Sequence, residues 1–238
     1  VTLSRTATFS RKLALFFKLH VNTLLQEGEY SLHVNDEAGP RKATIVYSGG
    51  DDVFIIGAWD DIIGFAVDLN DSLGDYAQGT LTISAGIGIY PEKYPVAAMA
   101  RQTGELEDAS KAYPGKNAVT LFDESGTYSW DEFINAVLAE KYELIRDFFQ
   151  TMQDYGKSFL YRLLDLMRSR DERINLARYA YLLARMEPGE KAPDENKKLY
   201  REFSRKMYQW MLDEKACKQA ITALYIYVYT IRETAEGE

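Results

Sequence analysis

The sequence predicts an α+β domain over residues 1–128, followed by an all-α domain over residues 129–238. In the first part, short β-rich runs alternate with helical patterns, and two of these runs enclose a glycine-rich turn. From residue 129 onward, long stretches of Leu, Tyr, Phe and Arg have helical spacing without strand-like alternation. The order of patterns therefore favours a small sheet with helices in one domain and packed helices in the other.

The first domain opens with an amphipathic helix over residues 3–25, because its apolar residues recur at three- and four-residue spacing. Residues 43–47 and 53–57 are β-rich and predict a hairpin whose tip holds two glycines and two aspartates. The remaining patterns predict four elements in chain order: a helix over residues 59–73, a strand over 81–90, a helix over 96–112 and a strand over 118–122.

One further strand in front would turn this order into a ferredoxin-like βαββαβ sheet with a helical addition. That leading strand is missing from the sequence, so we expect a sheet that is incomplete at its N-terminal side. The second domain is predicted to hold four helices, over residues 130–155, 158–186, 196–213 and 214–233. Residues 225–231 also alternate as a strand would, and a strand is the alternative there.

The composition excludes several kinds of protein. No apolar stretch reaches the roughly 20 residues that a membrane-spanning helix needs. Cys217 is the single cysteine and the only histidines are His20 and His33, so neither an internal disulfide nor a zinc cluster is expected. Residues 1–128 carry 10 Lys+Arg and 17 Asp+Glu, a net charge of −7 that does not attract a nucleic-acid backbone. We expect nucleic acid to be reached through partner subunits or a local patch.

The chain begins at Val1 and opens directly into the patterned helix. We therefore expect it to be part of a longer protein, without a signal peptide.

Asp51 and Asp52, at the hairpin tip, predict a metal site. Two adjacent carboxylates repel each other unless a cation lies beside them. Magnesium commonly binds one or two carboxylates and completes its shell with water and phosphate oxygens, and two such ions can act on both oxygens of a phosphoryl transfer. The alternative is a simple turn, since all four residues of Gly-Gly-Asp-Asp favour turns.

The residues around the tip resemble a known superfamily. The segment Ile45-Val46-Tyr47-Ser48-Gly49-Gly50-Asp51-Asp52-Val53-Phe54 is similar to the signature hairpin of GGDEF cyclases and polymerase palms. Ser84-Ala85-Gly86 resembles the Ser-x-Gly pattern of the following strand. Ala109-Ser110-Lys111, followed by Gly115-Lys116-Asn117, resembles the superfamily's element before the last strand. The three motifs occur in the superfamily's order, which implies an incomplete ferredoxin-like polymerase or cyclase palm.

Within the superfamily, the chain most resembles the large subunit of type III CRISPR effector complexes, in the A-type branch. This resemblance rests on Asp52 in place of Glu, on Gly57-Ala58-Trp59-Asp60, on Gly104-Glu105-Leu106-Glu107-Asp108, and on Leu3-Ser4-Arg5 with Ser10-Arg11. It implies a cytoplasmic palm that converts ATP into cyclic oligoadenylates for antiviral defence when the complex binds target RNA. The second domain matches that family's C-terminal helical domain by position and character.

Carried over to this chain, the resemblance makes Asp51 and Asp52 the catalytic ligands of Mg2+ or Mn2+, and Gly49 and Gly50 the backbone that approaches the triphosphate. Ser10 is a candidate contact to the adenine nucleotide, and a solvent-facing helix serine is the equal alternative. Lys111 and Lys116 are candidate phosphate contacts. Lys116 could instead cap its connector, or lie in solvent.

The superfamily's other metal-binding aspartate ends the first strand of the sheet, which this chain lacks. We therefore expect an upstream segment or a separate chain to supply the strand. The other expected partners are the remaining subunits of the complex, with CRISPR RNA and target RNA reached through them. A catalytically silent structural subunit is the alternative function. A diguanylate cyclase is disfavoured because the Glu of GGDEF is absent.

Overall fold

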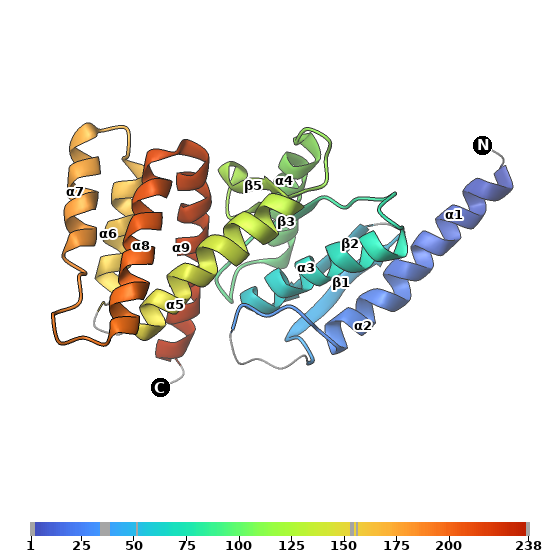
Figure 1. Cartoon of the computed structure of the whole chain (residues 1–238). Coiled ribbons are helices and arrows are strands. Elements are labelled where there is room, and N and C mark those ends of the chain that lie inside the picture. Colours follow the sequence, from blue (N-terminus) through green and yellow to red (C-terminus); the bar gives the residue numbers. More distant parts are fainter. Residues whose placement is uncertain (1–2, 34–38, 51, 153–154, 156, 237–238) are drawn as a thin grey trace. The chain divides into compact units, whose positions relative to one another are not determined.

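The structure is a computed structural model that describes residues 3–33, 39–50, 52–152, 155 and 157–236, with side chains as far as residue 232. The chain divides into two compact units, Val1–Trp130 (unit 1) and Asp131–Glu238 (unit 2). Unit 1 mixes helices with small sheets and unit 2 is helical, which confirms the predicted class of an α+β domain followed by an all-α domain (Figure 1). The division predicted after residue 128 stays a prediction.

Unit 1 begins with the predicted helix, built from three consecutive pieces. These are α1 (Leu3–Leu15), the π-helical η1 (Phe16–His20) and α2 (Val21–Gln26). No residue of α1 is buried, whereas Phe16 and Phe17 are both buried within η1. The wider π turn occurs where two neighbouring aromatic side chains enter the core together.

The strands of unit 1 form two separate sheets. β1 (Ala43–Gly49) pairs antiparallel with β2 (Asp52–Gly57), as the hairpin prediction expected. In the second sheet, β3 (Ala85–Ile87) is parallel to β4 (Ala118–Leu121), and β4 is antiparallel to β5 (Thr127–Ser129). The strand predicted over residues 81–90 was too long, because β4 pairs with only three of its residues. The short β5 was not predicted.

One apolar core joins these parts. α3 (Trp59–Tyr76) crosses the β1–β2 hairpin (Figure 1) and buries Phe65, Leu69 and Leu73 against the aromatic residues of η1. Hairpin residues and the segment before β3 pack on the same cluster, namely Ala43, Ile45, Val53, Ile55, Leu81 and Ile83. The helix α4 (Val96–Ala112), whose predicted bounds are confirmed, lies against β3.

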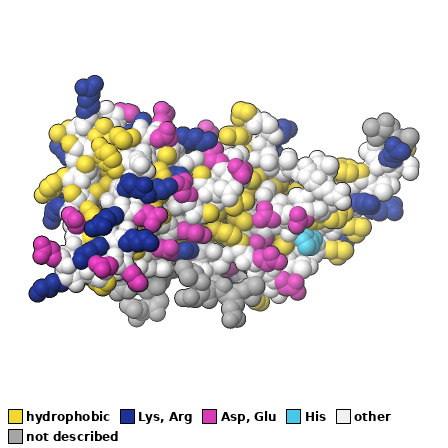
Figure 2. Space-filling model, in the orientation of Figure 1, with side chains coloured by type: hydrophobic (Ala, Val, Ile, Leu, Met, Phe, Trp, Pro, Cys, Tyr) yellow, Lys and Arg dark blue, Asp and Glu magenta, His cyan; other side chains and the backbone are white. Residues whose placement is uncertain are grey.

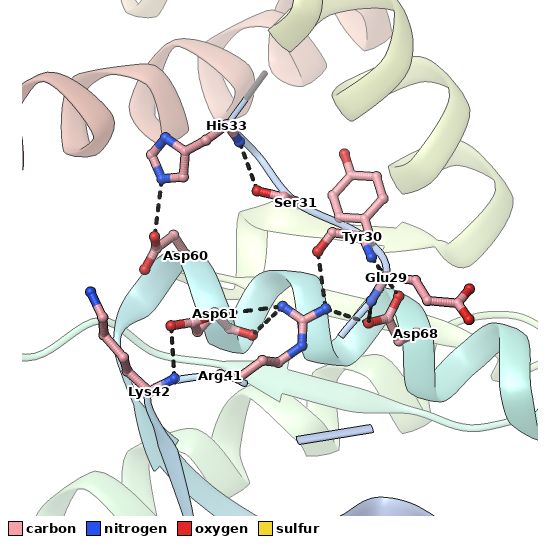
Figure 3. A network of polar contacts seen from close by, with 9 residues as sticks. All are labelled: Glu29, Tyr30, Ser31, His33, Arg41, Lys42, Asp60, Asp61 and Asp68. Carbon is pink, nitrogen blue, oxygen red and sulfur yellow. Dashed lines mark hydrogen bonds and ion pairs between the residues drawn. The ribbon is translucent and has the colours of Figure 1, made fainter. Parts of the chain in front are cut away.

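An ionic network fastens the connector before β1 to α3 (Figure 3). Arg41 pairs with Asp68, whose carboxylate also accepts hydrogen bonds from the backbone N–H groups of Glu29 and Tyr30, at 3.0 Å each. The side chains of Arg41 and Asp68 are 5% and 7% exposed. A buried pair of this kind depends on additional hydrogen bonds to its charges. Arg41 donates to the backbone O of Tyr30 and of Asp61, while its Nε has no hydrogen-bond partner among the described residues. The network therefore fixes where the hairpin begins relative to α3.

The described residues of unit 2 form the π-helical η3 (Glu132–Tyr142) and five α-helices: α5 (Glu143–Thr151), α6 (Lys157–Arg168), α7 (Arg173–Ala184), α8 (Asp194–Leu212) and α9 (Glu214–Glu236). The single helix predicted over residues 158–186 was wrong, since turn residues 169–172 divide it into α6 and α7. Residues 225–231 lie within α9, so the helix prediction is confirmed there. The rings of Phe148 and Phe203 stack in the core, with their centroids 3.8 Å apart.

Charge is distributed differently in the two units. On the face shown in Figure 2, acidic side chains of unit 1 gather around the one visible histidine, while both signs interleave on unit 2. None of the helices in the described residues is long and apolar enough to cross a membrane.

Candidate functional site

The hairpin tip presents Asp52 on one face of the β1–β2 sheet. Gly49 pairs with Asp52, and Tyr47 pairs with Phe54. Because directly opposed residues share a face, these four side-chain positions lie on the same side. A register shift between Ile45 and Tyr47 returns Ile45 and Ile55 to the other face, where they pack on the core. The site face is thus the one that turns away from α3.

The tip itself needs glycine. Gly50 has φ +69°, a left-handed conformation that glycine adopts without steric cost. At Gly49, a Cβ atom would come within 2.3 Å of the Tyr47 hydroxyl, so the missing side chain leaves room for that ring. Asp51 lies outside the described residues, so only Asp52 of the predicted metal-binding pair is placed.

A cleft of about 470 Å³ opens beside Asp52, between β2 on one side and β3 on the other. Its walls are mostly apolar, with Val53 and Ile55 from β2, Phe65 and Leu69 from α3, and Ile83, Ala85 and Ile87 from the β3 segment. Asp52, Glu107 and Lys111 are the charged residues that line it.

Helix α4 contributes one wall through residues spaced three or four apart: Ala100, Thr103, Gly104, Glu107 and Lys111. This spacing places them on one helical face. Gly86 of β3 sets the distance to the helix, because a Cβ atom there would lie 2.5 Å from the backbone N of Glu107 and 2.5 Å from the backbone O of Thr103. The Ser-x-Gly pattern thus serves packing at Gly86, while Ser84 lines the cleft.

Lys111 and Asp52 attract each other across the cleft. The Lys111 ammonium donates to Glu107 at 2.8 Å, and this hydrogen bond is the largest cause of the raised pKa of Lys111. Partial burial lowers that pKa, while the charges of Glu107, Asp52 and Asp108 raise it further. Lys111 is therefore a fixed positive charge at neutral pH, within the electrostatic range of the tip carboxylate.

The remaining predicted site residues do not line this cleft. Ser10 is exposed on α1, in the basic first helix. Lys116 is exposed in a turn of left-handed residues. The φ angles there are 82° at Gly115, 57° at Lys116 and 51° at Asn117. Gly49 and Gly50 form the tip next to the cleft. The structure thus brings Asp52 and Lys111 together and leaves Ser10 and Lys116 apart from them.

Two residues of the site were missed by the sequence reasoning, Glu107 and Tyr47. The signal for Glu107 was its position four residues before Lys111 on a predicted helix, where opposite charges meet. The signal for Tyr47 was its position two residues before Gly49, which puts both on one face of a strand.

The carboxylate of Asp52 can bind a hard divalent cation if a substrate supplies further oxygen ligands. Among the described residues, no group of three or more His, Cys, Asp or Glu side chains could hold a metal ion. Asp52 is exposed on the site face and supplies a carboxylate of the type that magnesium binds, with phosphate oxygens and water completing the shell. The donor chemistry therefore fits Mg2+ or Mn2+ that arrives together with a nucleotide.

Two family models match the chain. Residues 1–120 match Cas10/Cmr2, second palm domain, and residues 146–233 match the CRISPR RNA silencing complex Cmr2 subunit, second helical domain.

Curated relatives agree with these models. The chain is 47% identical over 235 residues to the CRISPR system single-strand-specific deoxyribonuclease Cas10/Csm1 (subtype III-A) of Mycobacterium tuberculosis, covering 98% of this chain and 28% of that protein. The protein of the same description from Streptococcus thermophilus is 41% identical over 235 residues, covering 98% of this chain and 29% of that protein. The chain thus spans under a third of the length of these relatives.

Solved structures share the fold. Csm1 of T. onnurineus has a TM-score of 0.64 at 23% identity, over 92% of this chain and 34% of that one. A Csm1–Csm4 cassette in complex with pppApApA has a TM-score of 0.62 at 25% identity, over 93% of this chain and 33% of that one. The cassette in complex with one ATP has a TM-score of 0.60 at 26% identity, over 92% and 32%. The chain therefore belongs to the Cas10/Cmr2 family, as a second palm domain followed by a second helical domain like those of the Csm1 large subunit in type III-A CRISPR systems.

Proposed function

We propose that unit 1 is the nucleotidyltransferase palm that joins ATP into cyclic oligoadenylates within a type III-A CRISPR effector complex. The observation that carries the proposal is that Asp52, beside the glycines of the hairpin tip, and Lys111 line the same cleft. Related Csm1–Csm4 cassettes have been solved with ATP and with pppApApA, a substrate and an oligoadenylate of this reaction class.

The residues suit a reaction in which a ribose hydroxyl displaces pyrophosphate from an α-phosphate. Asp51 and Asp52 would hold Mg2+ or Mn2+, which neutralises phosphate charge and polarises the attacking and leaving oxygens. Gly50 leaves the backbone of the tip uncovered by side chains, and Gly49 lies beside it under the Tyr47 ring. Lys111 supplies a permanent positive charge to the triphosphate, and its pairing with Glu107 limits where the ammonium can lie. Catalysis then rests on positioning and electrostatics.

The partners follow from the same proposal. Csm4 is the subunit found with Csm1 in the solved cassettes, and we propose that a Csm4-like subunit joins this chain. CRISPR RNA and target RNA are reached through the complex, which agrees with the acidic first 128 residues. Ser10 as a nucleotide contact and Lys116 as a phosphate contact stay predictions, each testable by alanine substitution in the same assay.

The test is product formation by the full complex containing this chain, incubated with ATP, Mg2+ and target RNA and analysed by mass spectrometry. We expect cyclic adenylates from the wild type and none from the Asp51→Ala/Asp52→Ala double variant, with assembly and RNA binding unchanged. Asp71→Ala, at an exposed aspartate of α3, is the control that should keep full activity. An assembled, RNA-bound wild-type complex without products would instead favour the structural subunit.

We also propose that a β-strand from outside residues 3–236 occupies the apolar part of the cleft, between Val53 and Ile55 on one side and Ile83 and Ile87 on the other, and joins the two sheets. The end of the cleft at Asp52 and Lys111 is left to the nucleotide. β2 and β3 each have one unpaired edge in the described structure, and both edges border the cleft. Unpaired backbone groups along apolar walls are a template for strand addition. Residues 81–84 have strand-like alternation yet no partner strand, as expected if that partner is supplied from elsewhere in a longer protein.

A further inference from the structure

Tyr47 is an exposed aromatic residue on the face that carries Asp52. The residue is 56% exposed although it lies in a paired strand, so its ring is accessible to a ligand. It lines the cleft together with Asp52 and Phe54. We propose that Tyr47 is the platform on which the base of the bound nucleotide stacks. The inference rests on the proposed function and names a residue for base recognition at the same site.

The backbone register fixes where the ring can lie. Tyr47 is opposite Phe54 and two residues from Gly49, while Gly49 is opposite Asp52. Tyr47 and Asp52 are therefore diagonal neighbours on one face, and such positions lie roughly 7–8 Å apart. A nucleotide whose phosphates lie at Asp52 thus has its ribose and base within reach of the Tyr47 ring.

The phenol leans toward the glycine tip. The Cβ atom that Gly49 lacks would lie 2.3 Å from the Tyr47 hydroxyl oxygen and 2.7 Å from its ring carbon Cζ. Any side chain at position 49 would therefore push the ring away from the tip. The two glycines thus have different uses: Gly49 leaves room for the aromatic ring, and Gly50, with nothing within 4 Å of its Cβ position, leaves the backbone of the tip open to phosphate.

The cleft has a charged end and an aromatic end, which matches the two ends of a nucleotide. Lys111 and Asp52 form the charged end, where phosphates and their cations bind. Tyr47 and its cross-strand neighbour Phe54, which is partly buried, form the aromatic end. Stacking on an aromatic side chain recognises the π-face that every base offers.

The test separates base binding from phosphate binding in the full complex containing this chain. Affinities for a non-cleavable ATP analogue and for inorganic tripolyphosphate are measured with Mg2+ for wild type, Tyr47→Ala and Tyr47→Phe. We expect Tyr47→Ala to lower the affinity for the ATP analogue by roughly tenfold or more and to leave the affinity for tripolyphosphate unchanged. Tyr47→Phe keeps the ring and should bind like the wild type. Tyr181→Ala, at a tyrosine of unit 2 that is 67% exposed, is the control.

Three of the other results overturn the inference, and one counts against the proposed function alone. Equal weakening of both ligands by Tyr47→Ala would mean that Tyr47 only shapes the hairpin tip. Unchanged affinity for both ligands would mean that the ring does not touch the base. A wild-type complex that binds the analogue but makes no product would count against the proposed function while leaving base stacking intact. A wild type that binds neither ligand overturns both proposals.

Discussion

Gly86 is the residue at which the main chain of β3 meets the main chain of α4. The two backbone atoms nearest to its absent Cβ belong to Glu107 and Thr103, each at 2.5 Å. Backbone atoms in a helix cannot swing aside as a long side chain can. The close packing of α4 on β3 therefore determines where the side chains of Glu107 and Lys111 lie in the cleft.

Gly86→Ala should destabilise unit 1 by about 1–3 kcal/mol, the usual cost of overpacking. Gly104→Ala is the matched control, since Gly104 lies in α4 and a Cβ atom there meets nothing within 4 Å. We expect that control to be neutral or to gain up to about 1 kcal/mol from helix propensity. Urea unfolding of both variants measures the difference. Equal stability of the two variants would contradict the close contact at Gly86.

Single residues of the site were predictable to different extents. Asp52 and Lys111 were chosen from motifs, and the structure places both on one cleft. Glu107 and Tyr47 were not chosen, although each has a local signal, because that signal alone does not show which contact brings the residue into the site. For Glu107 that contact is the packing of α4 on β3, and for Tyr47 it is the ring lying over Gly49.

At the scale of elements, the connector before β1 depends on α3. His33 hydrogen bonds to Asp60 at 3.0 Å, while Arg41 lies between the backbone of Tyr30 and the acidic side of α3 (Figure 3). Burial alone would raise the pKa of Asp60, but the hydrogen bond from His33 and those from the backbone outweigh it. The pKa of Asp60 is therefore lowered from its usual 3.8.

This shift predicts an acid-dependent loss of stability. A carboxyl group with a lowered folded pKa stabilises the fold fully above its unfolded value, and the stabilisation disappears as the pH falls through the folded value. The contribution of Asp60 should thus be complete above pH 3.8 and decline below it. Asp60→Asn should be less stable than wild type at pH 5, with the gap narrowing below pH 3.8 in urea titrations. A gap that stays constant with pH would show that the ionised carboxylate is not what stabilises this contact.

Helices and strands were predicted correctly from the sequence where local patterns determine them. The hairpin, α3 and α4 were predicted because turn glycines and helical periodicity are local signals. The strand over residues 81–90 was predicted too long because a strand also needs a partner, and β4 pairs with three residues only. The helix over residues 158–186 was predicted unbroken because Ser169 to Glu172 contain neither proline nor glycine, the usual signals of a break.

At the scale of the molecule, the two units differ in how completely their helices and strands are packed and paired. Unit 2 has its own core, in which α9 buries Ala220, Ala223, Leu224 and Ile226 completely. Unit 1 instead has two small sheets with free edges on one apolar cleft. Two- and three-stranded sheets gain much of their stability from packing on helices. Unit 1 is therefore the part whose structure should respond most to a further strand.

Hydrogen exchange tests the added strand. If a strand enters the cleft, amides on both of its sides gain hydrogen bonds, so exchange in β2 and in residues 81–87 should be slower in the full-length protein than in residues 1–238 alone. Amides of β4 are the internal control, because β3 and β5 already flank that strand and its exchange should not change. Slower exchange along one edge only would indicate a covering domain, since a strand that joins the sheets must protect both. Unchanged exchange along both edges would mean that the cleft stays open in the longer protein and serves the nucleotide alone.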